Sequence, residues 1–501
     1  MLIEKKIFKK IKDLKKRGKI IGLVHGVFDV IHFGHIKYFL EAKKKVDILI
    51  ASVTDDKFVN KGPGKPIFNI NQRIEVLQNI SSIDFVIKSK DRTSVNVINK
   101  LRPDLYFKGK DYKENYDITK NLEEEKKAVR NAKGKIEFTN SELFSSGKIV
   151  NEKFNYINDS ARNLLKKINI QKLKKDFFLA FEKKIKKKIL IIGDPILDIY
   201  QYVKPSGKSN KASIISTLIQ KEKIYGGGTF LSSNILSNFC DNLSVIQFSN
   251  KNNDYTYEKY LNKNIKRVKI KSNYKIIKKI RYIDNYNNTK LFQTTNNEEQ
   301  ELDSYDKYIY KKILKREISK SDYVYVFDYG YNLLSAEVVK IINNCKKIKI
   351  INCQTNSYNF GYNIYTKYKK AQLMCIDELE YRLGINNKNT EIKLLVDKNK
   401  KMTNGYKNFV VTQGKLGCYV KESNLKSIFI PTIFEKQSKD TIGCGDVFIT
   451  IFSLLKIFKS FNATEASILS HIAAAIHGDE FGNENVITFE KLYKVIESTL
   501  K

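Results

Sequence analysis

The chain has 501 residues, of which 42% are hydrophobic and 12% aromatic, and its formal net charge is +37. This length exceeds what one hydrophobic core usually serves, and the composition excludes a disordered or fibrous protein, so two or three globular domains are expected. The positive charge would suit nucleic acid, but the lysines are spread along the whole chain without a zinc-finger, RRM or basic-zipper pattern. Small anionic substrates are therefore expected as partners, and nucleic acid is not.

Cysteine usage and hydropathy suggest the compartment. All six cysteines lie in the C-terminal half and none forms a CxxC pair, so neither a zinc site nor a disulfide framework is predicted. The basic N-terminal residues are not followed by an apolar run, and the longest apolar run, residues 447–458, is too short for a bilayer and contains Lys456. We expect a cytoplasmic protein without a membrane partner.

Residues 19–89 alternate short β-branched runs with amphipathic segments. This alternation is typical of βαβ units and predicts a parallel sheet covered on both faces, in a first α/β domain over residues 1–150. The segments are, in chain order, KIIGLVHG, HIKYFLEAKKK, VDILIASV, NQRIEVLQNI and IDFVIK.

A polar, lysine-rich stretch over residues 151–187 has helical spacing and predicts a helical linker. A second α/β pattern follows over residues 188–501, beginning with KILIIGD. Within it, residues 199–217 form polar, extended segments that suit a small β lid over a site at the edge of the sheet.

Three of the five histidines, His25, His32 and His35, fall between the first predicted strand and the first helix. The turn from a parallel strand into a helix presents free N–H groups and the positive end of the helix dipole, where phosphates bind. Gly34 would let the backbone approach a phosphate, and two imidazoles can donate to it as charge develops during attack. A strand-end role without chemistry is the interpretation for His25.

These residues closely resemble the cytidylyltransferase-like nucleotidyltransferase family, which carries G-x-F-D followed by H-x-G-H. The resemblance implies that His32 and His35 stabilise the transition state, that Lys43 contacts substrate phosphate, and that Ser145 and Ser146 bind triphosphate. A nucleotide-binding role for Arg73 is also implied, against the alternative of a surface helix residue. The matching positions are Gly26, Phe28, Asp29, His32, Gly34, His35, Lys43, Arg73, the loop 108–112 and the segment 144–149.

Near the C-terminus, Gly443, Cys444 and Gly445 precede an apolar helix that begins with Asp446. Two glycines let successive N–H groups point at one spot and form an anion hole at the helix start. An aspartate beside that hole can take the proton of a hydroxyl that attacks a γ-phosphate. By itself the motif is better interpreted as an ordinary aspartate cap on a glycine-rich turn.

The wider pattern resembles the ribokinase-like (PfkB-type) kinases, whose D-T-x-G-A-G-D signature appears here as DTIGCGD. The resemblance implies that Asp446 is the base, that Gly443, Cys444 and Gly445 form the anion hole, and that Thr412 and Gly414 line the ATP site. It also implies a sugar site made by Asp194, Asp198, Gly227 and Gly228. Arg281 is a candidate for a phosphate on the sugar or on the transferred group, with a plain surface charge as the alternative.

The combination of the two domains resembles the bifunctional heptose kinase and nucleotidyltransferase of lipopolysaccharide synthesis, with the domain order reversed. The analogy implies phosphorylation of a heptose 7-phosphate-like sugar and adenylylation of a sugar 1-phosphate. Two departures fall in the sugar site: Lys211 replaces a carboxylate, and Phe230 replaces an asparagine. Such losses cost about 1–3 kcal/mol each when buried, so the identity of the sugar is left open.

Three hypotheses therefore stand. The first is a bifunctional enzyme of nucleotide-activated sugar synthesis, using Mg²⁺ with ATP in the kinase and Mg²⁺ with ATP or CTP in the transferase. The second is a nucleotidyltransferase whose kinase-like domain only binds a sugar, and the third is a basic nucleic-acid-binding protein. No metal site built from protein side chains is predicted, and the oligomeric state is open, a homodimer included.

Overall fold

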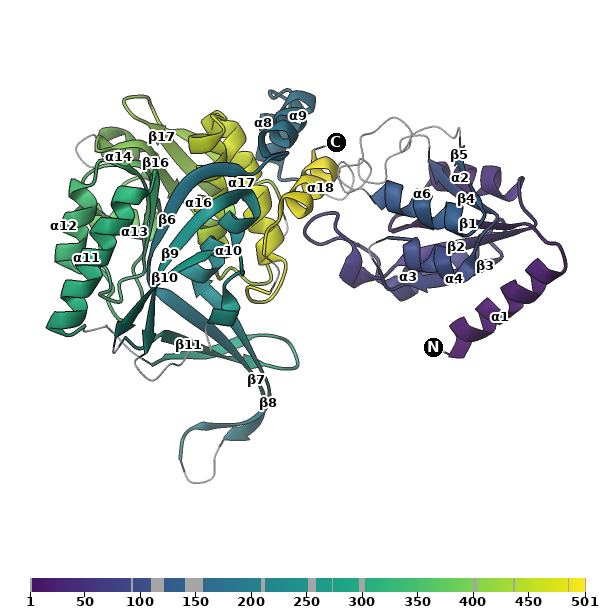
Figure 1. The fold of residues 1–501 in the computed structure, drawn as a ribbon, viewed down its shortest axis with the longest axis horizontal. Helices are drawn as coiled ribbons and strands as arrows, with labels where there is room; N and C mark the ends of the chain where they lie inside the picture. Colours follow the sequence, from purple (N-terminus) through teal and green to yellow (C-terminus); the bar gives the residue numbers. More distant parts are fainter. Residues whose placement is uncertain are drawn as a thin grey trace. The chain divides into compact units, whose positions relative to one another are not determined.

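The computed structural model describes residues 2–91, 93–109, 121–139, 156–208, 212–250, 258–272, 274–296, 302–399, 403–435, 438–484 and 486–500. The chain divides into two compact units (Figure 1). The N-terminal unit comprises Met1–Ile157 together with Tyr493–Lys501, and the C-terminal unit comprises Asn158–Leu492. The predicted α/β class is confirmed in both units.

The N-terminal unit is built on a five-stranded parallel sheet with the order β3-β2-β1-β4-β5. The order reverses between β1 and β4, and in open α/β sheets ligands bind outside the carboxyl ends of the strands at such a switch point. The elements are α1 Leu2–Lys16, β1 Ile21–Gly26, α2 Phe33–Lys43, β2 Ile48–Thr54, α3 Ile70–Gln78, β3 Phe85–Ser89, α4 Val95–Leu101, β4 Leu105–Gly109, α6 Asn121–Asn131 and β5 Lys135–Thr139.

Both faces of this sheet are covered, because its strands are apolar on both sides. One core joins Val24 and Leu49 of the sheet to Phe39 of α2 and Leu77 of α3. A second core joins the other strand face to α1, α4 and α6. The continuous β-branched runs of the sequence thus form central strands, as the parallel-sheet pattern predicts.

The C-terminal unit has a nine-stranded sheet with the order β10-β9-β6-β13-β14-β15-β16-β17-β18, parallel except for β17 and β18. Its strands are β6 Ile185–Gly193, β9 Cys240–Asn250, β10 Lys266–Ser272, β13 Tyr323–Asp328, β14 Ile348–Cys353, β15 Ala371–Asp377, β16 Tyr406–Thr412, β17 Gly417–Glu422 and β18 Ile428–Pro431. Its helices are α8 Asp159–Leu165, α9 Ile170–Phe181, α10 Thr229–Phe239, α11 Ser304–Lys320, α12 Ala336–Asn344, α13 Glu378–Ile385, α14 Ile392–Lys398, α16 Cys444–Ser453, a π-helical turn Leu454–Phe458 and α17 Ala463–Gly478. The last helix, α18 Phe489–Thr499, begins in this unit, and its residues from Tyr493 onward belong to the N-terminal unit.

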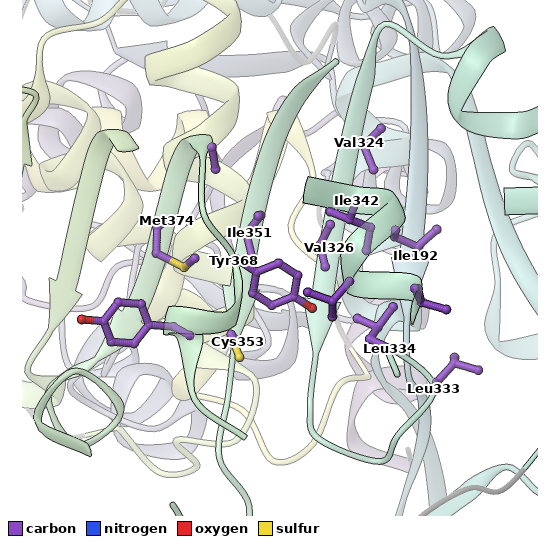
Figure 2. Packing of buried hydrophobic residues seen from close by; sticks show 14 of the residues in the cluster. Ile192, Val324, Val326, Leu333, Leu334, Ile342, Ile351, Cys353, Tyr368 and Met374 are labelled. Atoms are coloured by element: carbon purple, nitrogen blue, oxygen red, sulfur yellow. The ribbon is translucent and has the colours of Figure 1, made fainter. Parts of the chain in front are cut away.

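One face of the large sheet packs against α11 and α12 through a single apolar cluster. Figure 2 shows Val326, Ile351 and Met374, from β13, β14 and β15, pointing to this face, with Ile342 of α12 beside them. Helices α10 and α16 contact the sheet as well. Helix α16 thereby brings its N-terminal glycines to the carboxyl ends of the parallel strands, where a ligand site is expected.

A second, four-stranded sheet with the order β12-β11-β7-β8 forms the lid (Figure 1). The predicted segment 199–217 falls in its hairpin, and two later strands complete it. The strands are β7 Pro195–Lys208, β8 Ile215–Gly228, β11 Ile277–Asp284 and β12 Lys290–Thr295. Lys290 and Tyr200 of the lid both bond to Asp440, at 2.6 and 2.5 Å, so the lid is tied to the segment that leads into α16.

Within the predicted linker the described residues form α8 and α9, and strand β6 begins at Ile185. Both helices are assigned to the C-terminal unit. None of the helices in the described part of the chain is long and apolar enough to cross a membrane.

Candidate active sites

The histidine pair stands where β1 ends and α2 begins. His32 caps α2, its Nδ1 accepting a hydrogen bond from the Gly34 N–H at 3.1 Å. The ring centroids of His32 and His35 are 4.0 Å apart, and the Phe28 ring packs edge-on against His35 at 5.8 Å. Both imidazoles are thus held at the positive end of α2.

The surroundings of both histidines favour the neutral imidazole. Burial, the His32 ring and Lys61 lower the pKa of His35 to about 3, and burial followed by Lys61 lowers the pKa of His32. The Nδ1 atom of His35 is buried and has no hydrogen-bond partner among the described residues. An anion at this point would supply that partner and would favour the protonated form.

Asp29 and Arg73 shape the loops around the pair. The Asp29 carboxylate accepts hydrogen bonds from the N–H groups of Ile67 and Phe68 at 2.9 and 3.0 Å. The fully buried Arg73 guanidinium donates to the carbonyls of Phe68, Val27 and Thr54, and it pairs with Asp56. Arg73 is therefore a buried residue that fixes the end of β1, and not a surface helix residue.

Lys43 lies in the last turn of α2, whereas the histidines flank the first turn. Its amine is 2.6 Å from the Asp84 carboxylate and also donates to the Asp47 carbonyl. Lys61, which the sequence argument passed over, is the lysine whose charge acts on both histidines. The remaining predicted positions are Gly26, the last residue of β1, and Ser145 and Ser146, which lie outside the described residues.

The C-terminal unit contains a cavity of about 940 Å³, within the range of small-molecule sites. It brings together predicted residues from the whole length of this unit. The predicted residues that line it are Asp198, Gly228, Arg281, Thr412, Gly414, Gly443, Cys444, Gly445 and Asp446. Asp194 and Gly227 are not among the lining residues; both are buried immediately behind the wall, next to Gly228 and Asp198 respectively.

Asp446, in the first turn of α16, is only 7% exposed. Its Oδ1 accepts hydrogen bonds from the Tyr329 hydroxyl at 2.8 Å and from the Gln354 amide at 3.0 Å. Burial, with a smaller contribution from the negative charge of Asp198, raises its pKa to about 7. A carboxyl with this pKa can accept and release a proton near neutral pH.

The glycine loop has the backbone that its sequence predicts. Gly443 has φ +79°, and a Cβ there would approach Leu231 and His477 to within 3 Å. Around Gly445 there is open space on the Cβ side. The Cys444 thiol points to the Asp440 and Ala474 carbonyls, so it is packed against the protein.

Charge pairing fixes the part of the cavity where the sugar site is predicted. Asp198 pairs with Arg281 at 2.5 Å, and the Asn483 amide donates to its other oxygen at 3.3 Å. A Cβ on Gly227 would lie 2.0 Å from that carboxylate, so only glycine fits there. Phe230 is buried and does not line the cavity, whereas Lys211 lies outside the described residues.

Lining residues that were not among the predicted site residues include Lys279, Glu380 and Asn483. Lys279 precedes Arg281 by two positions on β11, and this spacing places both side chains on one face of a strand, which is a signal that could have found it. Burial lowers the pKa of Lys279, while Asp198 and Asp446 act in the opposite direction. Glu380 accepts a hydrogen bond from the N–H of Asp377, in a capping box that the local sequence DELE suggests, and a second from the N–H of Thr355, which only the fold brings near.

Comparison with known families gives a match in each unit. The profile of cytidylyltransferase-like proteins matches residues 23–153, and that of the pfkB family of carbohydrate kinases matches residues 186–454.

Curated relatives resemble a smaller part of the chain. "Bifunctional protein HldE" of Shewanella amazonensis is 39% identical over 105 residues, 21% of this chain and 22% of the relative. The protein of the same name from Azotobacter vinelandii is 38% identical over 104 residues, 20% of this chain and 22% of the relative. The matches thus span about a fifth of these relatives.

Solved structures resemble the chain over 62–63% of its length. They include ribokinase from Thermotoga maritima, with 17% identity, a TM-score of 0.45 and 99% of that chain covered. Phosphofructokinase-2 from Escherichia coli has 12% identity, a TM-score of 0.49 and 100% of that chain covered.

Proposed function

Because the chain belongs to the pfkB family of carbohydrate kinases and also carries a cytidylyltransferase-like domain, we propose that it is a bifunctional enzyme of nucleotide-activated sugar synthesis. The C-terminal unit phosphorylates a sugar or sugar phosphate with ATP. The N-terminal unit transfers a nucleotidyl group to a sugar phosphate and releases pyrophosphate.

The observation that carries the kinase proposal is the position of Asp446. This buried carboxyl, with a pKa of about 7, stands beside the glycine loop in a cavity that it shares with Asp198 and Lys279. Asp446 takes the proton of the sugar hydroxyl, whose oxygen then attacks the γ-phosphorus while ADP leaves. The N–H groups of residues 443–445 stabilise the negative charge on the transferred group.

Mg²⁺ is expected to enter bound to ATP. Within the described residues no group of three or more His, Cys, Asp and Glu side chains is arranged to hold an ion. The residues nevertheless fit a cation that the nucleotide brings: burial and Asp377 raise the pKa of Glu380 to about 8, and a nearby positive charge would ionise it. When bound, Mg²⁺ would neutralise charge on the phosphates. Asp377 at the end of β15 and Glu380 of α13 both line the cavity and would be its carboxylate partners.

In the N-terminal unit, His32 and His35 face the phosphorus that is attacked. The attacking phosphate comes from the second substrate, so the protein supplies position and charge stabilisation rather than a nucleophile. Lys61 adds positive charge beside the pair. Asp29 and Arg73 hold the loops in place, while Ser145 and Ser146 remain proposed triphosphate contacts.

The substrate class is a sugar phosphate, and a heptose 7-phosphate is the leading candidate from the resemblance stated above. Support comes from the two cations Lys279 and Arg281, which lie on one face of lid strand β11 in the cavity. The Asp198 carboxylate accounts for the charge of Arg281, which leaves Lys279 for a phosphate. ATP is the proposed nucleotide for the transferase, with CTP as the alternative.

The test is a panel of sugar phosphates read by mass spectrometry, with Mg²⁺-ATP and Mg²⁺-CTP in parallel. We expect ADP from at least one sugar phosphate, and pyrophosphate from nucleotide plus a sugar 1-phosphate. Pyrophosphate without ADP would show that the kinase-like unit only binds its sugar. Neither product, together with tight duplex-DNA binding at moderate salt, would refute both enzymatic proposals.

A further inference from the structure

The C-terminal unit has a second cavity, of about 740 Å³, in addition to the one that contains Asp446. Its wall is formed by the end of β13 and the loop that follows it, by helix α12, and by residues 359–370 of the segment that connects β14 to β15. The two cavities have no lining residue in common among the described residues. The side chains that bear on its chemistry are Asp328, Lys340, Tyr362, Lys367, Lys369 and Lys370.

The lining is strongly positive. Its one carboxylate, Asp328, is buried and already pairs with Lys367 at 2.6 Å, with further bonds from Tyr368 at 2.6 Å and Asn363 at 3.1 Å. The exposed amines of Lys340, Lys369 and Lys370 have no acidic partner within the described part of the chain. Three uncompensated ammonium groups around one concave site favour an anion.

The other lining groups suit a phosphorylated compound of moderate size. The carboxamide of Asn344 can bond to a hydroxyl group or to a base, and the ring of Tyr362 is 89% exposed at the edge. The carboxamides of Asn343 and Asn359 already bond to backbone groups, so they shape the wall. Lysine binds phosphate as a point charge without demanding one geometry. The volume is within the range of small-molecule sites.

We propose that this cavity binds a phosphorylated small molecule and that it is a regulatory site separate from the kinase active site. Hydrogen bonds connect the wall of the cavity to Asp446. Asn363 donates to the Gln354 carbonyl at 2.8 Å, and the Gln354 amide donates to Asp446 at 3.0 Å. Asn356 in the same segment donates at 2.8 Å to the carbonyl of Tyr329, whose hydroxyl also bonds to Asp446.

A bound phosphate changes this network through Lys367. The anion attracts the Lys367 amine and weakens its pairing with Asp328. Asp328 matters to the kinase site because burial and, as the second cause, the negative charge of Asp328 raise the pKa of Asp194. Figure 2 shows the Tyr368 ring near Cys353 at the end of β14, where this segment closes over the sheet. Occupancy is therefore expected to alter kinase turnover, a consequence that rests on the proposed kinase function.

The site itself is tested without activity. Pyridoxal 5′-phosphate is a phosphorylated aldehyde that condenses with lysine amines, releasing water, and borohydride then reduces the imine to a stable amine. At limiting reagent we expect Lys340, Lys369 and Lys370 to be labelled about tenfold faster than the exposed Lys312 and Lys315 of α11. Inorganic tripolyphosphate should suppress this labelling. Equal rates at all five lysines, or no protection, would overturn the site.

A charge-reversal pair supplies the matched control. Lys340→Glu combined with Lys370→Glu should abolish the protection of Lys369 by tripolyphosphate, whereas Lys312→Glu combined with Lys315→Glu makes the same change of net charge and should preserve it. Near-UV circular dichroism verifies that both variants are folded. Loss of protection in both variants would mean that only general charge attracts the anion, which refutes the cavity.

Kinase rates at saturating ATP and sugar phosphate then test the regulation. Competition by tripolyphosphate at the ATP site is the same in both double variants, so a difference between them reports the second cavity. We expect tripolyphosphate to change turnover at least about twofold more in the α11 control than in the cavity variant. Equal responses would refute the regulation. A lack of any kinase activity would instead refute the proposed function, while the labelling still decides whether the site exists.

Discussion

The kinase reaction should depend on pH through Asp446, because only its ionised form can accept the proton of the sugar hydroxyl. Burial raises its pKa to about 7, above the ordinary value for aspartate. The fraction of Asp446 in the active, deprotonated form therefore decreases as pH falls through about 7. Below that midpoint, kcat/KM for the sugar should fall about tenfold for each pH unit, and above it the rate should level off.

Lys279 gives this prediction a second perturbation. Its positive charge lowers the pKa of Asp446, so Lys279→Met should move the acid limb of the profile toward higher pH. Asp446→Asn should lower turnover by about 10²–10⁴ and remove the limb, since a carboxamide cannot act as a base. The assay is ADP release measured over about four pH units centred on the expected midpoint near 7.

Two controls keep the interpretation specific. The pyrophosphate-releasing reaction of the N-terminal unit should be unchanged in Asp446→Asn. The midpoint of thermal unfolding of this variant should stay close to that of the parent chain. An acid limb that persists in Asp446→Asn, or a limb that Lys279→Met moves toward lower pH, would refute the assignment of Asp446 as the base.

Three further predictions concern other residues. His35→Ala should lower the transferase rate by about 10²–10³ without affecting the kinase, because a neutral donor to the attacked phosphate is lost; equal loss of both activities would contradict two separate sites. Gly443→Ala should lower the free energy of unfolding by about 1–3 kcal/mol in urea titration, because φ is +79° and the added Cβ meets Leu231. The control Gly445→Ala should leave the free energy of unfolding unchanged, because there is open space around that Cβ. Arg73→Ala should destabilise the N-terminal unit by about 3–5 kcal/mol in denaturant titration, because buried carbonyl groups and Asp56 lose their hydrogen-bond partner. A change below about 0.5 kcal/mol would show that Arg73 is dispensable for the fold.

The sequence alone predicted the two α/β units, the strand-to-helix turn of His32 and His35, and the glycine loop of Asp446. These features depend on local order along the chain: apolar periodicity makes strands and helices, and glycines next to a helix start make an anion hole. These features can be predicted from the sequence because residues close together in the chain form them. Only the hairpin of the β lid was predicted, since β11 and β12 begin at residues 277 and 290, long after the hairpin ends at residue 228, and join it only by pairing in space.

Tertiary structure decided which side chains share a site. Lys43 is within the motif's helix, yet it lies a helix length from the histidines and pairs with Asp84, while Lys61 acts on them from a loop. Lys279, Glu380 and Asn483 come from three distant segments that meet only when the sheet and lid are assembled. The pKa of Asp446 depends on the same assembly, because desolvation and the charge of Asp198 are properties of the surrounding fold and not of the chain on either side.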